Sequence, residues 1–356
     1  MKGKLPGLKK FGRSPAFWWR EPSVGSSLLG PAAAIYGSVA RKNLVHGERV
    51  AFDLPVLCIG NFTAGGGGKT PTALALAQAA LALGRRPGFI SRGYGRKSRK
   101  PLIVDAGRHR VRDVGDEPLL LARLAPTSVA ADRAAALKLL ITEAGIDFVI
   151  MDDGFQSQRL AIDYALIALD AGRGIGNGRV FPAGPLRAPL LDQIAHADGL
   201  LVIGEGEGAA APLRMMARAG RPIFHGQLVP KSKQILIGER VLAFAGIADP
   251  QKFYASLTEL GAEVAVSRDF PDHHAFSDDD LYDLTKTAAK ETLILATTAK
   301  DAVRLATGSE AAKEFARNCA VLDVALELRS PLHGERIIRE TLAAFDRRRW
   351  KVLSRT

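Results

Sequence analysis

The glycine-rich stretch near the start of this chain reads Asn61-Phe62-Thr63-Ala64-Gly65-Gly66-Gly67-Gly68-Lys69-Thr70-Pro71-Thr72. An apolar run at 56–60 precedes it, which is typical of a buried parallel strand, and the Ala- and Leu-rich residues 73–83 predict a helix. A strand, a glycine loop ending in Gly-Lys-Thr and a helix together indicate a phosphate-binding P-loop. The strict motif has glycine at the position of Thr63, and a merely flexible glycine-rich loop is the alternative interpretation.

This loop has the chemistry needed to hold a nucleotide such as ATP. Glycines allow consecutive backbone N–H groups to curl around phosphate oxygens, and the helix N-terminus adds partial positive charge. Lys69 supplies a full positive charge, and the Thr70 hydroxyl is a ligand for Mg²⁺. The expected nucleotide-binding residues are Thr63, Ala64, Gly65, Gly66, Gly67, Gly68, Lys69 and Thr70.

The composition is that of a globular protein with an unevenly placed positive charge. The 356 residues are enough for two domains, and two cysteines give no disulfide framework, which favours a reducing cytoplasm. The net charge is +12, with nine Lys and Arg against two acids in residues 1–49 and ten against one in residues 85–112. Such stretches fit anionic lipid, nucleic acid or a phosphorylated substrate, and a solvated basic surface is the alternative.

The N-terminal segment, residues 1–48, has features of a membrane surface element. Basic residues at 2–10 are followed by Trp18 and Trp19, and residues 23–40 carry no charge. Pro31 and the glycines of this run argue against a spanning helix, and no small-residue cleavage site indicates a signal peptide. An amphipathic helix lying on a membrane and a helix packed on the protein's own core both remain open.

Several strand ends in residues 49–230 carry polar groups that suit a ligand site. A strand at 87–91 runs into Arg92-Gly93-Tyr94, and the strand around 146–151 ends in Asp152 and Asp153, the arrangement that reaches a nucleotide-bound Mg²⁺. Asp116, beside Pro118 at a helix start, is either a cap or a base or metal contact. Residues 172–187 predict a long ordered loop rich in glycine and proline.

Residues 231–325 form a second run of alternating strands and helices, and a helix closes the chain within 326–356. His273 and His274 lie between these elements in a loop, where no third ligand at suitable spacing supports a metal site and a capping or surface role is the usual one. The expected fold is therefore α/β: a P-loop NTPase-like, mainly parallel sheet flanked by helices, with a second smaller α/β domain and an N-terminal amphipathic helical segment.

Taken together, these motifs resemble the tetraacyldisaccharide 4'-kinases of lipid A biosynthesis. The similar segments, in family order, are Gly60-Asn61-Phe62-Thr63, Gly65 to Pro71, Ser91-Arg92-Gly93-Tyr94-Gly95, Val114-Gly115-Asp116-Glu117-Pro118, Asp152-Asp153-Gly154-Phe155-Gln156, Pro182-Ala183-Gly184-Pro185-Leu186-Arg187 and Phe270-Pro271-Asp272-His273. Threonine at the first P-loop position, here Thr63, is also typical of that family. Ser157 departs from it, because the family usually has histidine there.

The resemblance implies an ATP- and Mg²⁺-dependent transfer of phosphate to the 4'-hydroxyl of an acylated glucosamine disaccharide 1-phosphate. It also implies a monotopic enzyme on the cytoplasmic face of the bacterial inner membrane. Asp116 would be the base, with His273 as its partner and Lys69 on the phosphates, while Asp152 and Asp153 with Thr70 would serve the metal. The residues that would contact substrate or phosphate are Arg92, Tyr94, Glu117, Arg133, Gln156 and Arg187.

Two other classes of function compete with a kinase. A regulatory or targeting P-loop ATPase that switches partners is one, although the sequence lacks Asn-Lys-x-Asp and residues 297–301 have the wrong spacing for it. A nucleic-acid-binding ATPase would use residues 85–112, whose aromatic residues are only Phe89 and Tyr94, a thin stacking platform. We therefore expect a lipid substrate and no nucleic-acid partner.

Overall fold

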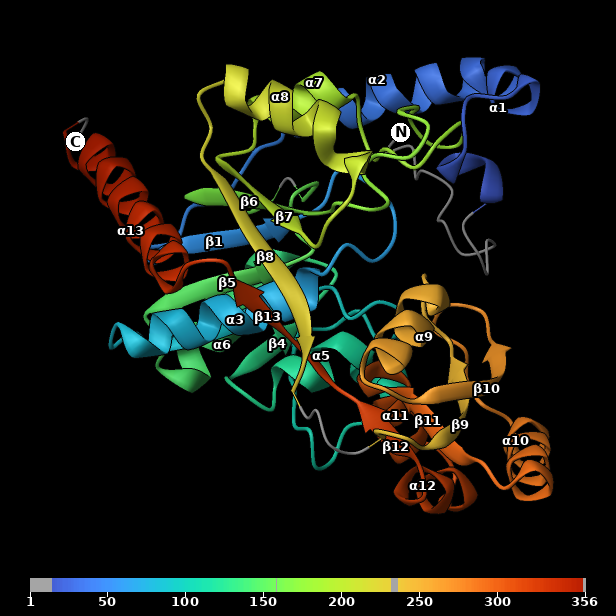
Figure 1. Cartoon of the computed structure of the whole chain (residues 1–356). Helices are drawn as coiled ribbons and strands as arrows, with labels where there is room; N and C mark the ends of the chain where they lie inside the picture. Colours follow the sequence, from blue (N-terminus) through green and yellow to red (C-terminus); the bar gives the residue numbers. More distant parts are fainter. Residues whose placement is uncertain (1–14, 158, 232–235, 355–356) are drawn as a thin grey trace.

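The computed structural model describes residues 15–157, 159–231 and 236–354. The basic run at 2–10 lies outside the described residues. Two sheets organise the chain, a larger one in the core unit and a smaller one in the second unit (Figure 1). The fold is the expected α/β arrangement with a mainly parallel sheet flanked by helices.

The larger sheet places the glycine loop at its centre. Nine strands of the described residues pair in the order β13-β8-β7-β6-β1-β5-β2-β4-β3. All neighbours are parallel except the two outermost pairs, β13 with β8 and β3 with β4. The strands are β1 (Val56–Gly60), β2 (Pro87–Ser91), β3 (Leu102–Ile103), β4 (Thr127–Val129), β5 (Phe148–Asp152), β6 (Tyr164–Asp170), β7 (Gly199–Ile203), β8 (Ile223–Pro230) and β13 (Val324–Leu328).

Helices cover both faces of this sheet, because every central strand is apolar on both sides. One face packs against α3 (Lys69–Ala82), α5 (Asp116–Leu121) and α13 (Pro331–Leu353), and the other against α6 (Arg133–Ala144), α7 (Leu190–Ala195) and α8 (Ala210–Arg218). Short α4 (Val111–Val114) and the 3₁₀ turn η2 (Glu207–Ala209) complete the core unit. Residues 172–187 contain no helix or strand, as their glycine and proline content predicts.

The second unit is a four-stranded parallel sheet in the order β10-β9-β11-β12. Its elements are β9 (Arg240–Ala245), α9 (Pro250–Glu259), β10 (Glu263–Asp269), α10 (Asp278–Glu291), β11 (Ile294–Thr298), α11 (Ala299–Ala306), α12 (Glu310–Arg317) and β12 (Ala320–Leu322). Helix α9 packs on one face, and α10, α11 and α12 pack on the other.

The chain enters and leaves the second unit through two adjacent strands. β8 and β13 pair antiparallel from Gly226 opposite Leu328 to Pro230 opposite Val324 (Figure 1). The sequence analysis assigned residues from 326 onward to a C-terminal helix. Instead, β13 occupies 324–328 and α13 begins at Pro331, because a short strand at a sheet edge carries too little periodicity to be recognised.

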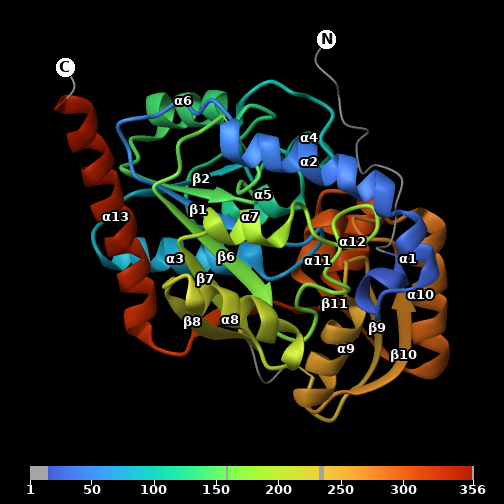
Figure 2. The same cartoon turned by 90° about the horizontal axis from the view of Figure 1, so that it is seen from above.

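The described N-terminal residues form η1 (Ala16–Trp19), α1 (Val24–Leu28) and α2 (Gly30–His46). Helix α2 packs against α7 and lies on the outer side of the core unit, as the view from above shows (Figure 2). Val24, Leu28 and Ile35 expose 80%, 78% and 71% of their surface, whereas Trp18 is buried. Within the described residues, no helix combines the length and apolarity needed to cross a bilayer.

Candidate active site

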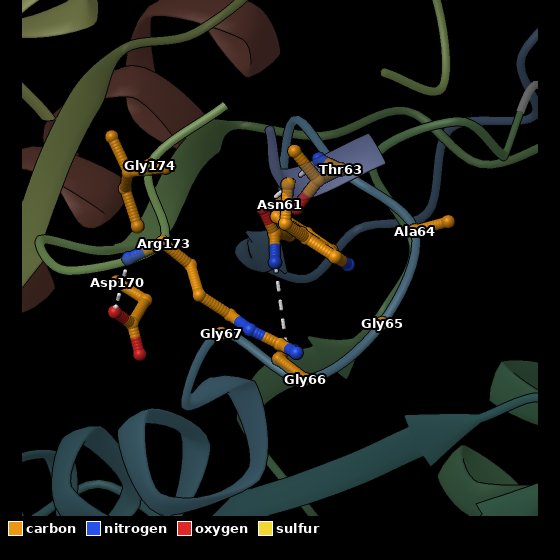
Figure 3. Close-up of a pocket in the computed structure, with 11 residues that line it drawn as sticks. Asn61, Thr63, Ala64, Gly65, Gly66, Gly67, Asp170, Arg173 and Gly174 are labelled. Carbon is orange, nitrogen blue, oxygen red and sulfur yellow. Dashed lines mark hydrogen bonds between the residues drawn. The ribbon is translucent and has the colours of Figure 1, made fainter. Parts of the chain in front are cut away.

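Hydrogen bonds of the Asn61 side chain stabilise the conformation of the P-loop. Asn61 Oδ1 accepts hydrogen bonds from the Thr63 backbone N–H at 3.0 Å and from its hydroxyl at 3.2 Å, and Asn61 Nδ2 donates to Gly66 O at 3.4 Å (Figure 3). A Cβ at Gly67 would lie 2.1 Å from Asn61 Nδ2, and Gly67 has a φ of +78°, so only glycine fits at this position. Thr63 has no positive φ, which explains why the loop does not require glycine there.

Lys69 lies in the mouth of the loop. Its Nζ donates to Gly65 O at 3.1 Å and to Gly66 O at 3.0 Å, and lies 3.9 Å from Asp153 Oδ1. Burial lowers the pKa of Lys69, and the negative charge of Asp153 opposes this shift. The ammonium group therefore sits where a phosphate oxygen could take over the contacts that the loop carbonyls now make.

Asp152 ends β5 at the same sheet edge as the P-loop, and Asp153 follows it, but their pKa values shift in opposite directions. Burial, reinforced by Asp153, raises the pKa of Asp152 to about 6. Asp152 Oδ2 accepts from Thr70 Oγ1 at 3.2 Å, while its buried Oδ1 has no hydrogen-bond partner among the described residues. A buried carboxylate oxygen without a partner beside the Thr70 hydroxyl fits an oxygen-coordinated Mg²⁺ ion.

Asp153 is instead neutralised by arginine. Arg187 donates NH1 to Asp153 Oδ1 at 2.7 Å and NH2 to Oδ2 at 3.1 Å. Burial alone would raise the pKa of Asp153, but Arg187 and Lys69 outweigh it and hold this pKa well below its usual range. Arg187 also donates Nε to Thr63 O at 2.9 Å, so it ties the P-loop to the end of β5.

Gln156 belongs to the same polar network. Its Nε2 donates to Asn61 O at 3.1 Å, and its Oε1 accepts from Arg187 at 3.1 Å. The fully buried Gln193, which the sequence analysis missed, donates to Phe62 O at 3.2 Å and Ala188 O at 2.8 Å. Gln156 and Arg187 were expected to contact substrate or phosphate. In the structure, both donate hydrogen bonds to backbone carbonyls of the nucleotide loop and so stabilise its conformation.

A second cluster joins the core unit to the second unit. Asp116, at the first position of α5, places Oδ2 3.0 Å from His273 Nδ1, so the two residues expected to act together are in contact. Arg304 of α11 donates Nε to the same oxygen at 2.9 Å, and its NH2 also contacts it. Burial alone would raise the pKa of Asp116, but its hydrogen bonds with the side chains of His273 and Glu117 and the charge of Arg304 hold this pKa well below its usual range.

Glu117 pairs with a second cation from α11. Lys300 Nζ lies 2.7 Å from Glu117 Oε1, and burial raises the pKa of Glu117 despite the lysine charge. Asp116, Glu117 and His273 are close enough together to hold a metal ion. However, Lys300 and Arg304 already neutralise both carboxylates, which makes a third cation unfavourable there. Neither Lys300 nor Arg304 was predicted, since both lie in an ordinary amphipathic helix.

Three further predicted residues lie around these clusters. Arg133 is buried, with NH2 3.4 Å from Asp153 O and with Nε unpartnered among the described residues. Burial, with the adjacent charge of Arg92, lowers the pKa of Arg133 to about 10. Tyr94 is half exposed, and its ring centre lies 5.2 Å from that of His273. Two neighbouring arginines, one with an unsatisfied donor, favour an anion at this position.

The P-loop also borders a pocket that the sequence did not reveal. It is lined by the loop together with Trp19, Leu169, Asp170, Arg173 and Gly174 (Figure 3). The Arg173 guanidinium lies 4.4 Å from the Trp19 ring centre. Arg173 Nε lies 3.1 Å from Asp249 Oδ2, and Lys252 contacts Asp170, so the second unit also reaches this side of the loop.

Comparisons with known proteins show the family to which this chain belongs. Residues 25–343 match the family described as LpxK, tetraacyldisaccharide-1-P 4'-kinase. Proteins named tetraacyldisaccharide 4'-kinase are 52% identical in Brucella ovis, over 88% of this chain and 92% of that one, and 50% identical in Mesorhizobium japonicum, over 94% and 98%. A crystal structure of LpxK from Aquifex aeolicus in complex with ATP has a TM-score of 0.70 and 28% identity, and covers 89% of this chain and 99% of that one.

Proposed function

Because the chain belongs to the tetraacyldisaccharide-1-phosphate 4'-kinase family, we propose that the P-loop site moves the γ-phosphate of ATP to the 4'-hydroxyl of an acylated glucosamine disaccharide 1-phosphate. The protein is a kinase of lipid A biosynthesis that uses ATP. The observation that carries the proposal is the position of two clusters at the sheet edge: a phosphate loop with Lys69, and the Asp116–His273 pair.

The phosphate loop neutralises charge in the proposed reaction, and the Asp116–His273 pair accepts a proton. The loop N–H groups and Lys69 bind and neutralise the phosphates, and phosphoryl transfer depends mainly on such positioning and electrostatic stabilisation. Mg²⁺, when bound by Thr70 and Asp152, supplies further positive charge for the phosphate oxygens. The Asp116–His273 pair accepts the proton of the attacking hydroxyl, which is a poor nucleophile while it keeps that proton.

Arg133 and Arg92 are proposed to hold an anionic group of the substrate or nucleotide. Arg133 is buried, its Nε has no hydrogen-bond partner within the part of the chain that the structure describes, and it repels Arg92, so a bound phosphate oxygen would relieve both features. Tyr94 and Glu117 lie beside the proton-accepting pair and are proposed to line the sugar site.

The lipid substrate is proposed to be taken from the cytoplasmic face of the inner membrane. Val24, Leu28 and Ile35 expose apolar surface on α1 and α2, and burial of such surface favours membrane contact. A groove between α2 and residues 179–189 has Arg41 and Arg179 among its lining residues. The exposed apolar surface supports a peripheral, monotopic attachment.

The direct test is incubation with γ-labelled ATP, Mg²⁺ and the acylated disaccharide 1-phosphate, followed by locating the new phosphate. One phosphate per disaccharide at the 4' position is expected. ATP hydrolysis without transfer to the lipid would instead favour a partner-switching ATPase, and the proposal would be abandoned.

A further inference from the structure

We propose that the C-terminal end of α13, with Trp350 and the basic residues beside it, forms a second contact with an anionic lipid surface. This contact is separate from the apolar surface of α1 and α2, and the inference rests on the proposed function at a membrane. Together, the two contacts fix how the core unit is oriented on the bilayer, and with it the height of the P-loop above the lipid that it phosphorylates.

Trp350 exposes its ring to solvent. The chain has three tryptophans, of which Trp18 is 3% exposed, Trp19 is half-buried and Trp350 is 74% exposed. An indole combines a large apolar area with one N–H donor, and this combination favours the boundary between lipid chains and headgroups. A single exposed apolar side chain is ordinary on a protein surface, so the meaning of Trp350 depends on the residues around it.

Cations surround Trp350. The stretch 347–351 reads Arg347-Arg348-Arg349-Trp350-Lys351, which contains four positive charges and no acid. Arg349 pairs with Asp53 at 3.2 Å, and both Arg347 and Lys351 are exposed. Because helical residues three and four positions apart are neighbours, Arg347, Trp350 and Lys351 lie on one face of α13. An apolar ring flanked by two cations is a pattern that binds an anionic membrane surface.

The end of α13 is fixed to the core unit. Arg348 donates Nε to Asp163 Oδ1 at 2.7 Å and another N–H to Phe52 O at 3.1 Å. The Asp163 side chain is 1% exposed and also accepts the Val56 N–H at 2.9 Å, so this ion pair anchors the helix beside the start of β1. An α-helix turns by about 100° per residue, so Trp350 points nearly opposite to Arg348 and away from the core.

The two contacts lie on one side of the molecule. Helices α1, α2, α7 and α8 occupy this side, and the C-terminal end of α13 rises toward it (Figure 1). The view from above shows α2, α7, α8 and α13 in front of the sheet (Figure 2). Leu191 of α7 is 72% exposed, and Arg214 and Arg218 of α8 are exposed. A bilayer touches a whole face at once, so apolar and basic side chains spread over this side favour a lipid surface.

The contacts also lie at opposite ends of the central strand β1. Arg348 reaches Phe52 O and Leu54 O, just before β1 begins. At the other end, Trp19 of η1 lines the pocket at the P-loop, which follows β1. Attachment at both ends prevents the core unit from tilting on the membrane. A lipid substrate stays in its bilayer, so a fixed tilt keeps the P-loop edge at a constant distance from the substrate headgroup.

The test is sedimentation of the full-length protein with phosphatidylcholine vesicles that contain or lack phosphatidylglycerol. Trp350→Ala should weaken binding to the anionic vesicles by about tenfold, because less apolar area is buried. Arg347→Gln with Lys351→Gln should weaken this binding by about fivefold for each charge removed. The difference between this double variant and the wild type should vanish at high salt and on vesicles without phosphatidylglycerol.

Matched variants separate this contact from general effects of the substitutions. Tyr282→Ala removes a ring that is 65% exposed on α10, at the opposite end of the molecule (Figure 1). Arg339→Gln removes a cation of α13 that pairs with Glu335 at 2.7 Å. Both variants should bind vesicles as the wild type does. Trp350→Phe keeps an aromatic ring and should retain most of the affinity.

Fluorescence and activity report the position and the effect of the contact. Vesicles with brominated acyl chains, which quench an indole in contact with them, should quench the wild type, and Trp350→Phe should lose the share that belongs to Trp350. Trp350→Ala should leave kcat and KM for ATP unchanged with substrate dispersed in detergent. Its KM for substrate embedded in anionic vesicles should rise in line with the lost vesicle affinity.

The inference is overturned if the wild type does not bind anionic vesicles, if Trp350→Ala binds them as tightly as the wild type, or if quenching is the same in Trp350→Phe. A dimer of the wild type that Trp350→Ala abolishes, with vesicle affinity unchanged, would also overturn it and assign this surface to a second copy of the chain. A wild type that binds vesicles through Trp350 but does not phosphorylate the lipid would refute the proposed function and leave the contact standing, so the two failures are distinguishable.

Discussion

Lys69→Ala removes the ammonium group at the mouth of the P-loop and should separate activity from stability. Among the described residues, the Nζ atom donates to Gly65 O and Gly66 O and lies 3.9 Å from Asp153 Oδ1, and all three residues belong to the proposed phosphate site. Loss of one preorganised electrostatic group costs about 10²–10³ in kcat, or about 2.7–4 kcal/mol of transition-state stabilisation. We therefore expect a loss of that size in lipid phosphorylation.

The free energy of unfolding should change much less. Two hydrogen bonds to loop carbonyls contribute about 1 kcal/mol each, and the desolvation of the ammonium, seen in its lowered pKa, offsets most of this. We expect a change within about 1 kcal/mol by urea denaturation without nucleotide. Lys313→Ala, which removes a partly exposed lysine on α12 that pairs with the exposed Glu310, is the matched control and should change neither quantity. If Lys69→Ala keeps more than about a tenth of wild-type kcat, against that expected loss, the role assigned to the P-loop lysine is wrong.

Three more predictions follow from the site and the N-terminal helices. Asp116→Ala and His273→Ala should each lower kcat far more than they raise KM for ATP. Because the two residues act as a unit, the double variant should be little less active than the poorer single variant. Additive losses in a double-mutant cycle would refute their joint role. Deleting residues 1–40, introducing Ile35→Asp, or raising salt should each weaken sedimentation with anionic vesicles, and unchanged sedimentation of the truncated protein would place the attachment elsewhere. Burial raises the pKa of Asp152 from 3.8 to about 6, so the ionised carboxylate costs stability as pH rises through that range. Without Mg²⁺ and above pH 6, Asp152→Asn should therefore raise the free energy of unfolding by about 1–3 kcal/mol while losing activity. An unchanged or lower free energy of unfolding would contradict the assigned burial penalty.

The elements that the sequence predicted best are contiguous and strongly patterned. The strand before the glycine loop, Lys69 at the start of α3 and Asp152 at the end of β5 all follow from short apolar runs and their flanking residues. Parallel strands bring their carboxyl ends to one edge, so Thr70 and Asp152 meet although 82 positions separate them. The pairing of Asp116 with His273 could be expected only from the family resemblance, since neither residue has a local signal for it.

The tertiary structure alone decided which charges meet across the two units. Arg304 and Lys300 lie on a short helix whose pattern indicates only one buried face, yet they reach Asp116 and Glu117 across 188 and 183 positions. The return of β13 to the core sheet has the same origin, because that strand pairs with β8 although the whole second unit lies between them in the sequence. Local sequence therefore determined the phosphate loop and the strands that carry it. The protonation states of the Asp116–His273 pair depend on cations that are distant in the sequence, because electrostatic interactions are set by distance in space and by burial, not by separation along the chain.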